Sequence, residues 1–130
     1  MTAVDTNVII RFVTADDPVQ SPRARDLIHA GPVWVGKTVL LETQWVLSSV
    51  YELPRPQVVR TLRAFLGLPQ VAVEDESAVA VALDAYAAGI DFADAFHLAS
   101  AATSTRFASF DGELRRRATK RNMSPPVVEP

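Results

Sequence analysis

Short apolar runs alternate with longer helix-like segments along this chain, and the alternation leaves few folds open. Glycine, proline and aspartate mark most junctions, as at Asp16-Asp17-Pro18, Gly31-Pro32 and Gly67-Leu68-Pro69. Strands that alternate with helices of ten or more residues pair in parallel through right-handed crossovers. We therefore expect an α/β fold: one domain over residues 1–130, with a small parallel β-sheet of about four to five strands flanked by helices on both sides.

Each expected element is bounded by such a junction or by a change in the spacing of apolar residues. The strands are expected at residues 2–5, 33–36, 71–73, 106–110 and 127–128. The helices are expected at about residues 8–13, 18–29, 38–52, 57–66, 77–88, 91–103 and 113–121.

Composition excludes several classes of protein. The chain is 48% hydrophobic and contains no cysteine, so it can bury a core but cannot form disulfides or thiolate zinc sites. A membrane span needs about 20 apolar residues, and Asp84 interrupts the longest candidate run, residues 78–90. Asp5 and Arg11 interrupt any secretory h-region. We expect a soluble, cytoplasmic protein with no membrane partner.

Two aspartates lie where strands are expected to end. Asp5 follows the first strand and Asp111 the fourth, and in a parallel sheet the carboxyl ends of the strands border the usual site crevice. Each has a structural alternative: Asp5 could cap the helix that follows, and Asp111, which precedes Gly112, could form a turn or cap the last helix.

Two further acids lie on helix faces that look apolar. Glu42 has Val39, Trp45 and Val46 three or four residues away, so it is expected to point into a core or cleft. In DFADAFHLA, Asp91 fits a helix cap, whereas Asp94 needs a partner because an unpaired buried charge costs several kcal/mol. A structural ion pair is the alternative for Glu42.

Taken together, Asp5, Glu42, Asp94 and Asp111 would place four negative charges in one crevice. Carboxylates so placed repel one another unless a cation is bound, and a set of oxygen ligands selects Mg²⁺ or Mn²⁺. Sites of this kind hydrolyse phosphodiesters, because the metal activates a water molecule and neutralises charge on the phosphate. We expect a metal-dependent hydrolase.

Four segments carry a resemblance to a known family: VDTNVI at residues 4–9, LLETQWVL at 40–47, DFADAFHLA at 91–99 and SFD at 109–111. In this order and spacing the chain resembles PIN-domain ribonucleases, specifically the VapC-type toxins of bacterial toxin–antitoxin pairs. The resemblance covers essentially the whole chain. It implies an endoribonuclease dependent on Mg²⁺ or Mn²⁺.

The resemblance also implies roles for single residues. Asp5, Glu42, Asp94 and Asp111 match the acidic quartet, with Asp5 and Asp94 as direct metal ligands and Glu42 ligating directly or through water. The supporting positions are Asn7, Ser109 and Asp91. For contacts with the substrate RNA we name Arg11, Arg115 and Arg116; the alternative is an ordinary solvated basic helix face.

Partners follow from the resemblance and from the middle helices. The formal net charge of −2 becomes +2 once the four proposed ligand carboxylates are set aside, which suits an RNA substrate. The middle of the chain carries more apolar surface than one small core needs, with ordinary burial as the alternative, and the residues concerned are Trp34, Trp45, Val46, Val50, Val59, Leu62, Phe65 and Leu66. The resemblance implies a homodimer face and a groove for a VapB-type antitoxin.

Two other classes of protein remain as alternatives. A catalytically silent interaction domain would keep the fold and work by binding alone. A Mg²⁺-dependent phosphatase or receiver domain also uses an aspartate at a strand end. The phosphatase pattern places a second aspartate where this chain has Asn7, and a receiver needs a lysine late in the sheet, whereas the only lysines are Lys37 and Lys120.

Overall fold

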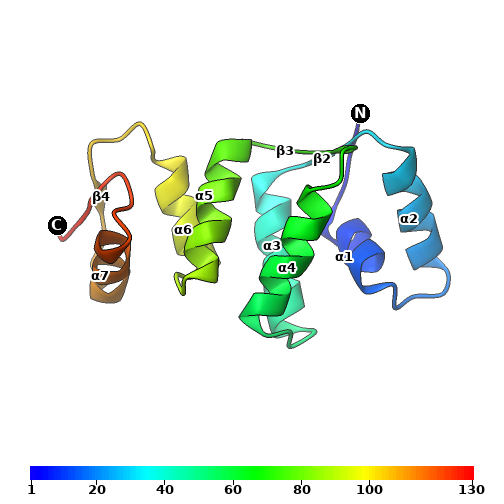
Figure 1. Cartoon of the computed structure of the whole chain (residues 1–130), viewed down its shortest axis with the longest axis horizontal. Coiled ribbons are helices and arrows are strands. Elements are labelled where there is room, and N and C mark those ends of the chain that lie inside the picture. The colour runs from blue at the N-terminus through cyan, green and yellow to red at the C-terminus, as the bar shows by residue number, and fades with distance from the viewer. The chain divides into compact units, whose positions relative to one another are not determined.

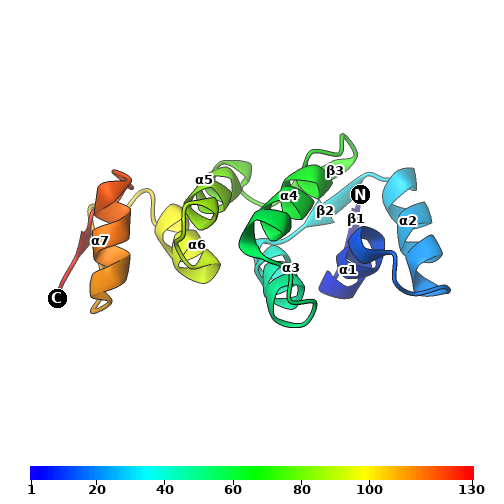
Figure 2. The same cartoon turned by 60° about the horizontal axis from the view of Figure 1, so that its bottom comes forward.

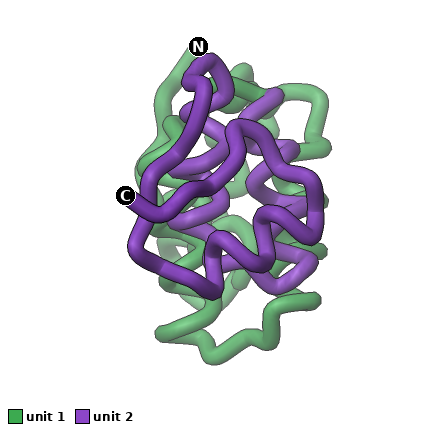
Figure 3. The backbone as a smooth tube through the Cα atoms, turned by 90° about the vertical axis from the view of Figure 1, so that its left-hand side faces the viewer, with its two compact units in different colours: residues 1–76 green, residues 77–130 purple.

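The computed structural model describes all 130 residues, which form two compact units, residues 1–76 and 77–130 (Figure 3). Each unit combines helices with a small parallel sheet, so the α/β class predicted from the sequence is confirmed. All five predicted strands are present, three in the sheet of the first unit and two in that of the second.

The first unit is built on a three-stranded parallel sheet in the order β1-β2-β3. The strands β1 (Thr2–Ala3), β2 (Val33–Val35) and β3 (Val71–Val73) pair in parallel, with Val33 opposite both Thr2 and Val71. Parallel neighbours need crossover connections. Helices α1 (Thr6–Thr14) and α2 (Gln20–Ala30) connect β1 to β2, and α3 (Lys37–Ser49) and α4 (Arg55–Leu66) connect β2 to β3.

The core of the first unit lies between this sheet and the four helices. Helices α1 and α2 run side by side, as do α3 and α4 (Figures 1 and 2). Phe12 of α1 meets Phe65 of α4 edge to face, with ring centroids 5.8 Å apart. The largest buried side chains are apolar, in line with the helical periodicity of the sequence: Ile9, Ile28, Leu40, Leu47, Val58, Leu62 and Phe65.

The second unit contains α5 (Glu76–Ala87), α6 (Phe92–Ser100), β4 (Phe107–Ala108), α7 (Gly112–Lys120) and β5 (Val127–Val128). Strands β4 and β5 pair in parallel, with Phe107 opposite Val127. Leu98, Ala118 and Val127 form the buried cluster that joins α6, α7 and β5. Gly89 turns the chain between α5 and α6 at a φ of 111°, and its carbonyl accepts a hydrogen bond from the Arg117 guanidinium.

The predicted elements agree with the structure in type and order, and differ mainly at their ends. Helix α1 begins at Thr6 and not at residue 8, because Asp5 caps it. The expected strand at residues 106–110 is reduced to β4, so Asp111 lies three residues beyond the strand and does not end it. No helix combines the length and the apolar character that crossing a membrane requires.

Candidate functional site

Asp5 lies between β1 and α1, where it is the N-cap of the helix. Its Oδ1 accepts a hydrogen bond from the backbone N–H of Thr6 at 2.7 Å. A carboxylate at this end of a helix is stabilised by the helix dipole and by the unpaired N–H groups of the first turn. Its capping role and its exposure are compatible with ligand binding, because the cap uses one carboxylate oxygen.

Glu42 of α3 is joined to the same helix terminus through Thr6. The Thr6 hydroxyl donates a 2.5 Å hydrogen bond to Glu42 Oε1, and Thr6 itself is buried. Asp5 and Glu42 line one pocket of about 390 Å³, together with Asn7, Arg11 and Tyr51. We call this the acid pocket. The first unit thus brings together two of the four predicted acids and the predicted supporting residue Asn7.

A network of polar side chains holds Arg11 at the edge of the acid pocket. Asp16 accepts hydrogen bonds from Tyr51 Oη at 2.7 Å, from Thr14 Oγ1 at 2.7 Å and from Arg11 Nη1 at 3.1 Å. These bonds, that of Tyr51 first, lower the pKa of Asp16 from its ordinary 3.8 to about 2. The Asp16 contact also raises the pKa of Arg11, whose guanidinium is fixed beside the acidic pair.

In the second unit, Asp94 lies in the first turn of α6 and is half-buried. Burial first, and then the charges of Asp91 and Asp111, raise the pKa of Asp94 above its ordinary value, while His97 acts slightly in the opposite direction. The ionised form of Asp94 is therefore less favourable in the folded chain than in water. A bound cation would reverse this effect, because it favours the charged carboxylate.

Asp91 and Asp111 both cap helices. Asp91 Oδ2 accepts from the Asp94 N–H at 3.1 Å, which confirms its expected capping of α6. Asp111 Oδ1 accepts from the N–H groups of Glu113 and Leu114, both at 3.0 Å, at the start of α7. The structure thus confirms the capping alternative for Asp111. In both Asp91 and Asp111, capping leaves the second carboxylate oxygen for other contacts.

The remaining predicted residues belong to α7 or lie just before it. Ser109 Oγ accepts a 3.0 Å hydrogen bond from the Asp111 N–H, which supports the turn that presents this carboxylate. Arg115 is partly buried, and its Nη1 is enclosed without a hydrogen-bond partner. Arg116 is exposed and lies 3.9 Å from Glu113. Glu113 pairs more closely with Arg117, at 2.5 Å.

The predicted acids are divided equally between the units: Asp5 and Glu42 in the first, Asp94 and Asp111 in the second. Neither unit by itself brings three histidine, cysteine or acidic side chains into a group able to hold a metal ion. All four acids offer carboxylate oxygens, the donors that Mg²⁺ and Mn²⁺ prefer, so the chemistry of the set fits such an ion.

Three residues near the acid pocket were not singled out from the sequence: Thr6, Asp16 and Tyr51. A signal existed for part of the pocket wall, because Glu42 and Val46 lie four residues apart on one side of α3, and Val50 follows four residues later at the end of the helix. Asp16 and Asp17 are indistinguishable in the sequence, yet Asp17 Oδ1 accepts from the N–H groups of Val19 and Gln20 just before and at the start of α2. Only the fold separates their roles.

Comparison with known proteins gives one clear match. The family model described as PIN domain matches residues 2–120, which include both units and all four predicted acids. A search of curated proteins gives no match to the chain.

Proposed function

The chain belongs to the PIN domain family, a family of nucleases that typically depend on divalent metal ions, and on this basis we propose that it is a metal-dependent endoribonuclease. The substrate of the proposed reaction is an RNA phosphodiester bond, and the nucleophile is water. The observation that carries the proposal is the acid pocket, where Asp5 and Glu42 meet beside Asn7 at the start of α1. We propose Mg²⁺ or Mn²⁺ as the cofactor.

In this proposal, Asp5, Glu42, Asp94 and Asp111 would be the ligands of the ion. When bound, Mg²⁺ or Mn²⁺ would supply Lewis acidity toward water and toward the phosphate oxygens. Thr6 orients Glu42 through its hydroxyl, and Ser109 supports Asp111. The raised pKa of Asp94 supports its role, because a carboxylate that is unfavourable without a cation gains most from binding one.

The activity test compares Asp94→Asn with the wild-type chain on labelled, structured RNA in the presence of Mg²⁺ or Mn²⁺. We expect cleavage by the wild type, none in excess chelator, and a loss of about a hundredfold or more in the variant, since metal ions supply several kcal/mol of transition-state stabilisation. The matched control is Asp26→Asn, which makes the same change at an exposed position of α2 and should cleave normally.

A second readout does not depend on activity. In chelator, Asp94→Asn should unfold at the same temperature as the wild type or slightly higher, because it removes a carboxylate whose ionisation the fold disfavours. Mg²⁺ should raise the melting temperature of the wild type and of Asp26→Asn, but not of Asp94→Asn. Cleavage that persists in chelator, or in Asp94→Asn, would contradict the proposal.

We extend the proposal to the cellular role: a cytoplasmic toxin that acts as a homodimer and is neutralised by a VapB-type antitoxin. Large apolar side chains at the surface support a protein partner, since Trp45 is 57% and Val50 61% exposed. Growth arrest on expression in bacteria, relieved in Asp94→Asn, tests the toxin role. Sedimentation at twice the 14.2 kDa chain mass tests the dimer.

A further inference from the structure

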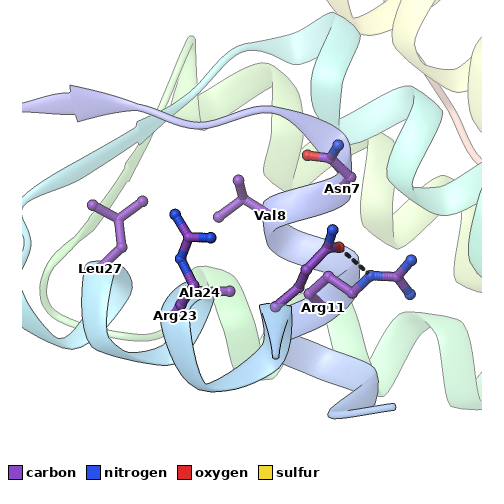
Figure 4. Close-up of a pocket in the computed structure, with 7 residues that line it drawn as sticks. Asn7, Val8, Arg11, Arg23, Ala24 and Leu27 are labelled. Carbon is purple, nitrogen blue, oxygen red and sulfur yellow. Dashed lines mark hydrogen bonds between the residues drawn. The ribbon is translucent and has the colours of Figure 1, made fainter. Parts of the chain in front are cut away.

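A second pocket, of about 440 Å³, lies between α1 and α2 (Figure 4). Asn7, Val8 and Arg11 line it from α1, and Arg23 and Leu27 from α2. We call it the cationic pocket, because its lining includes two arginines and no carboxylate. Val8 and Leu27 provide an apolar surface beside the charged groups.

The cationic pocket adjoins the acid pocket, since Asn7 and Arg11 line both. A strand whose scissile phosphate lies at Asp5 and Glu42 would therefore meet Asn7 and Arg11 first, and Arg23 beyond them. The positive charge of the cationic pocket would neutralise the backbone phosphate adjacent to the scissile one.

The two arginines differ in how they are held. Arg11 is fixed by Asp16 and by Gln20, whose Oε1 accepts from Arg11 Nε at 2.9 Å (Figure 4). Its charge is partly balanced by Asp16. Arg23 is exposed and forms no ion pair, so its full charge is available to a ligand. Guanidinium groups bind phosphate oxygens with two parallel hydrogen bonds, which makes Arg23 the stronger candidate contact.

We propose that the cationic pocket binds a backbone phosphate of single-stranded RNA, next to the phosphate cleaved at the acid pocket. Arg23 provides the main contact, Arg11 a second one, and Val8 and Leu27 pack against the sugar or base. The inference rests on the proposed nuclease function, and it identifies the surface along which the RNA substrate leaves the acid pocket. A protein segment is the other conceivable occupant, but the shared wall with the acid pocket and the positive lining favour nucleic acid.

The test measures binding of a short fluorescein-labelled single-stranded RNA by fluorescence anisotropy, in chelator, with the full-length chain. We expect Arg23→Gln to weaken binding by about tenfold at low salt and to reduce the slope of log Kd against log salt by about 0.7. A single-stranded DNA of the same sequence should show the same dependence on Arg23, because the phosphate is common to both. Arg11 is a poorer test position, since its removal also frees Asp16.

Arg25→Gln is the matched control. Arg25 is an exposed arginine of the same helix and does not line the pocket, so its loss should change Kd by less than about twofold. If Arg23→Gln and Arg25→Gln bind RNA with equal affinity, the proposal is overturned, and a protein segment becomes the favoured occupant of the cationic pocket. Equal melting temperatures of the two variants would show that folding is unaffected.

Cleavage kinetics separate this inference from the proposed function. Arg23→Gln should raise KM and leave kcat unchanged, because the contact is the same in the ground and transition states. A wild type that binds RNA through Arg23 but does not cleave it would refute the nuclease function and keep the phosphate site. If the wild type cleaves RNA and Arg23→Gln has the same kcat and KM, the phosphate site is refuted and the nuclease function stands.

Discussion

Asp5, Asp91 and Asp111 each cap a helix, whereas Asp94 and Glu42 do not. For these three aspartates, helix capping and metal binding are compatible, because capping uses only one carboxylate oxygen. Capping does not account for Asp94 and Glu42: the pKa of Asp94 is raised, and Glu42 is held by Thr6 at a pocket wall. These two residues therefore distinguish a metal site from a set of helix caps most clearly.

Single-residue roles were only partly predictable from the sequence. Asp91 as a cap follows from its place before a helical pattern, and the structure confirms it. The pairing of Arg11 with Asp16 does not follow, because it depends on the reversal of the chain after α1, where Ala15 has a φ of 52°. Positive φ is rare for alanine, so local sequence gives no sign of this turn.

The Asp16 network predicts a pH dependence of stability. The folded pKa of Asp16 lies near 2, below its ordinary 3.8, so its contribution is present above about pH 4 and is lost as the pH falls toward 2. Asp16→Asn should therefore show a smaller drop in the urea midpoint between pH 5 and pH 2 than the wild type. Urea unfolding across that range, followed by circular dichroism, measures the difference.

Tyr51→Phe checks the cause, because the Tyr51 hydroxyl is the largest contributor to the lowered pKa. The Asp16 carboxyl, followed by carbon-13 NMR, should titrate at a higher pH in Tyr51→Phe than in the wild type. An unchanged titration midpoint would show that the Tyr51 contact does not hold this carboxylate in solution.

At the scale of elements, the sequence predicted type and order well and predicted ends less well. The predicted ends of α4 and β3 lie within two residues of the observed ends, because the prolines and glycines that flank them restrict the backbone directly. The end of α3 was overestimated: the helix stops at Ser49, and Glu52 takes a φ of 55°. The helix ends in a local turn, in which the carbonyls of Val46 and Leu47 accept from the N–H groups of Tyr51 and Leu53. Apolar spacing does not indicate such a turn, because a positive φ is rare for glutamate.

Helix α7 allows the capping and ligand roles of Asp111 to be separated. Asp111→Ala should lower the free energy of unfolding by about 1 kcal/mol, because the N–H groups of Glu113 and Leu114 lose their acceptor. Asp111→Asn should retain most of that stability, since asparagine is a good cap, and still reduce metal-dependent cleavage. Chemical denaturation and RNA cleavage, measured on both variants, give the comparison.

The opposite pattern would argue against a ligand role. If Asp111→Asn cleaves like the wild type and Asp111→Ala loses activity only in proportion to stability, Asp111 acts as a cap alone. Glu129→Gln, an exposed acid in the same unit, controls for the change in charge.

At the scale of the whole molecule, the family match covers residues 2–120 and so includes both units. The order of the four motifs in the sequence made this family recognisable, and the match confirms it at the level of the PIN domain. The sequence also predicted one joint site for acids that lie 17 to 106 residues apart. A joint site has a consequence that can be measured across the entire chain.

If the four acids hold one ion, Mg²⁺ should protect backbone amides in both units at once. We expect hydrogen exchange to slow in α1 and in α6 when Mg²⁺ replaces chelator, because binding stabilises every segment that supplies a ligand. Hydrogen-exchange mass spectrometry resolves the two helices. In Asp94→Asn the protection should disappear from both units, and in Asp26→Asn it should persist.

Protection confined to one unit would contradict a joint site. It would assign the ion to the acids of that unit alone, either Asp5 with Glu42 or Asp94 with Asp111.

The wall formed by Asn7 and Arg11 has a practical consequence for inhibition. Because these two residues line both pockets of the first unit, two small fragments, one in each pocket, would contact opposite sides of the same wall. One fragment would carry a chelating group toward Asp5 and Glu42, the other an anion toward Arg23. Joining them with a short linker makes the second binding step intramolecular, with an effective concentration in the millimolar range. Two weakly binding fragments would then form one ligand. Its selectivity for this protein over others with a similar acidic site would come from the contact with Arg23.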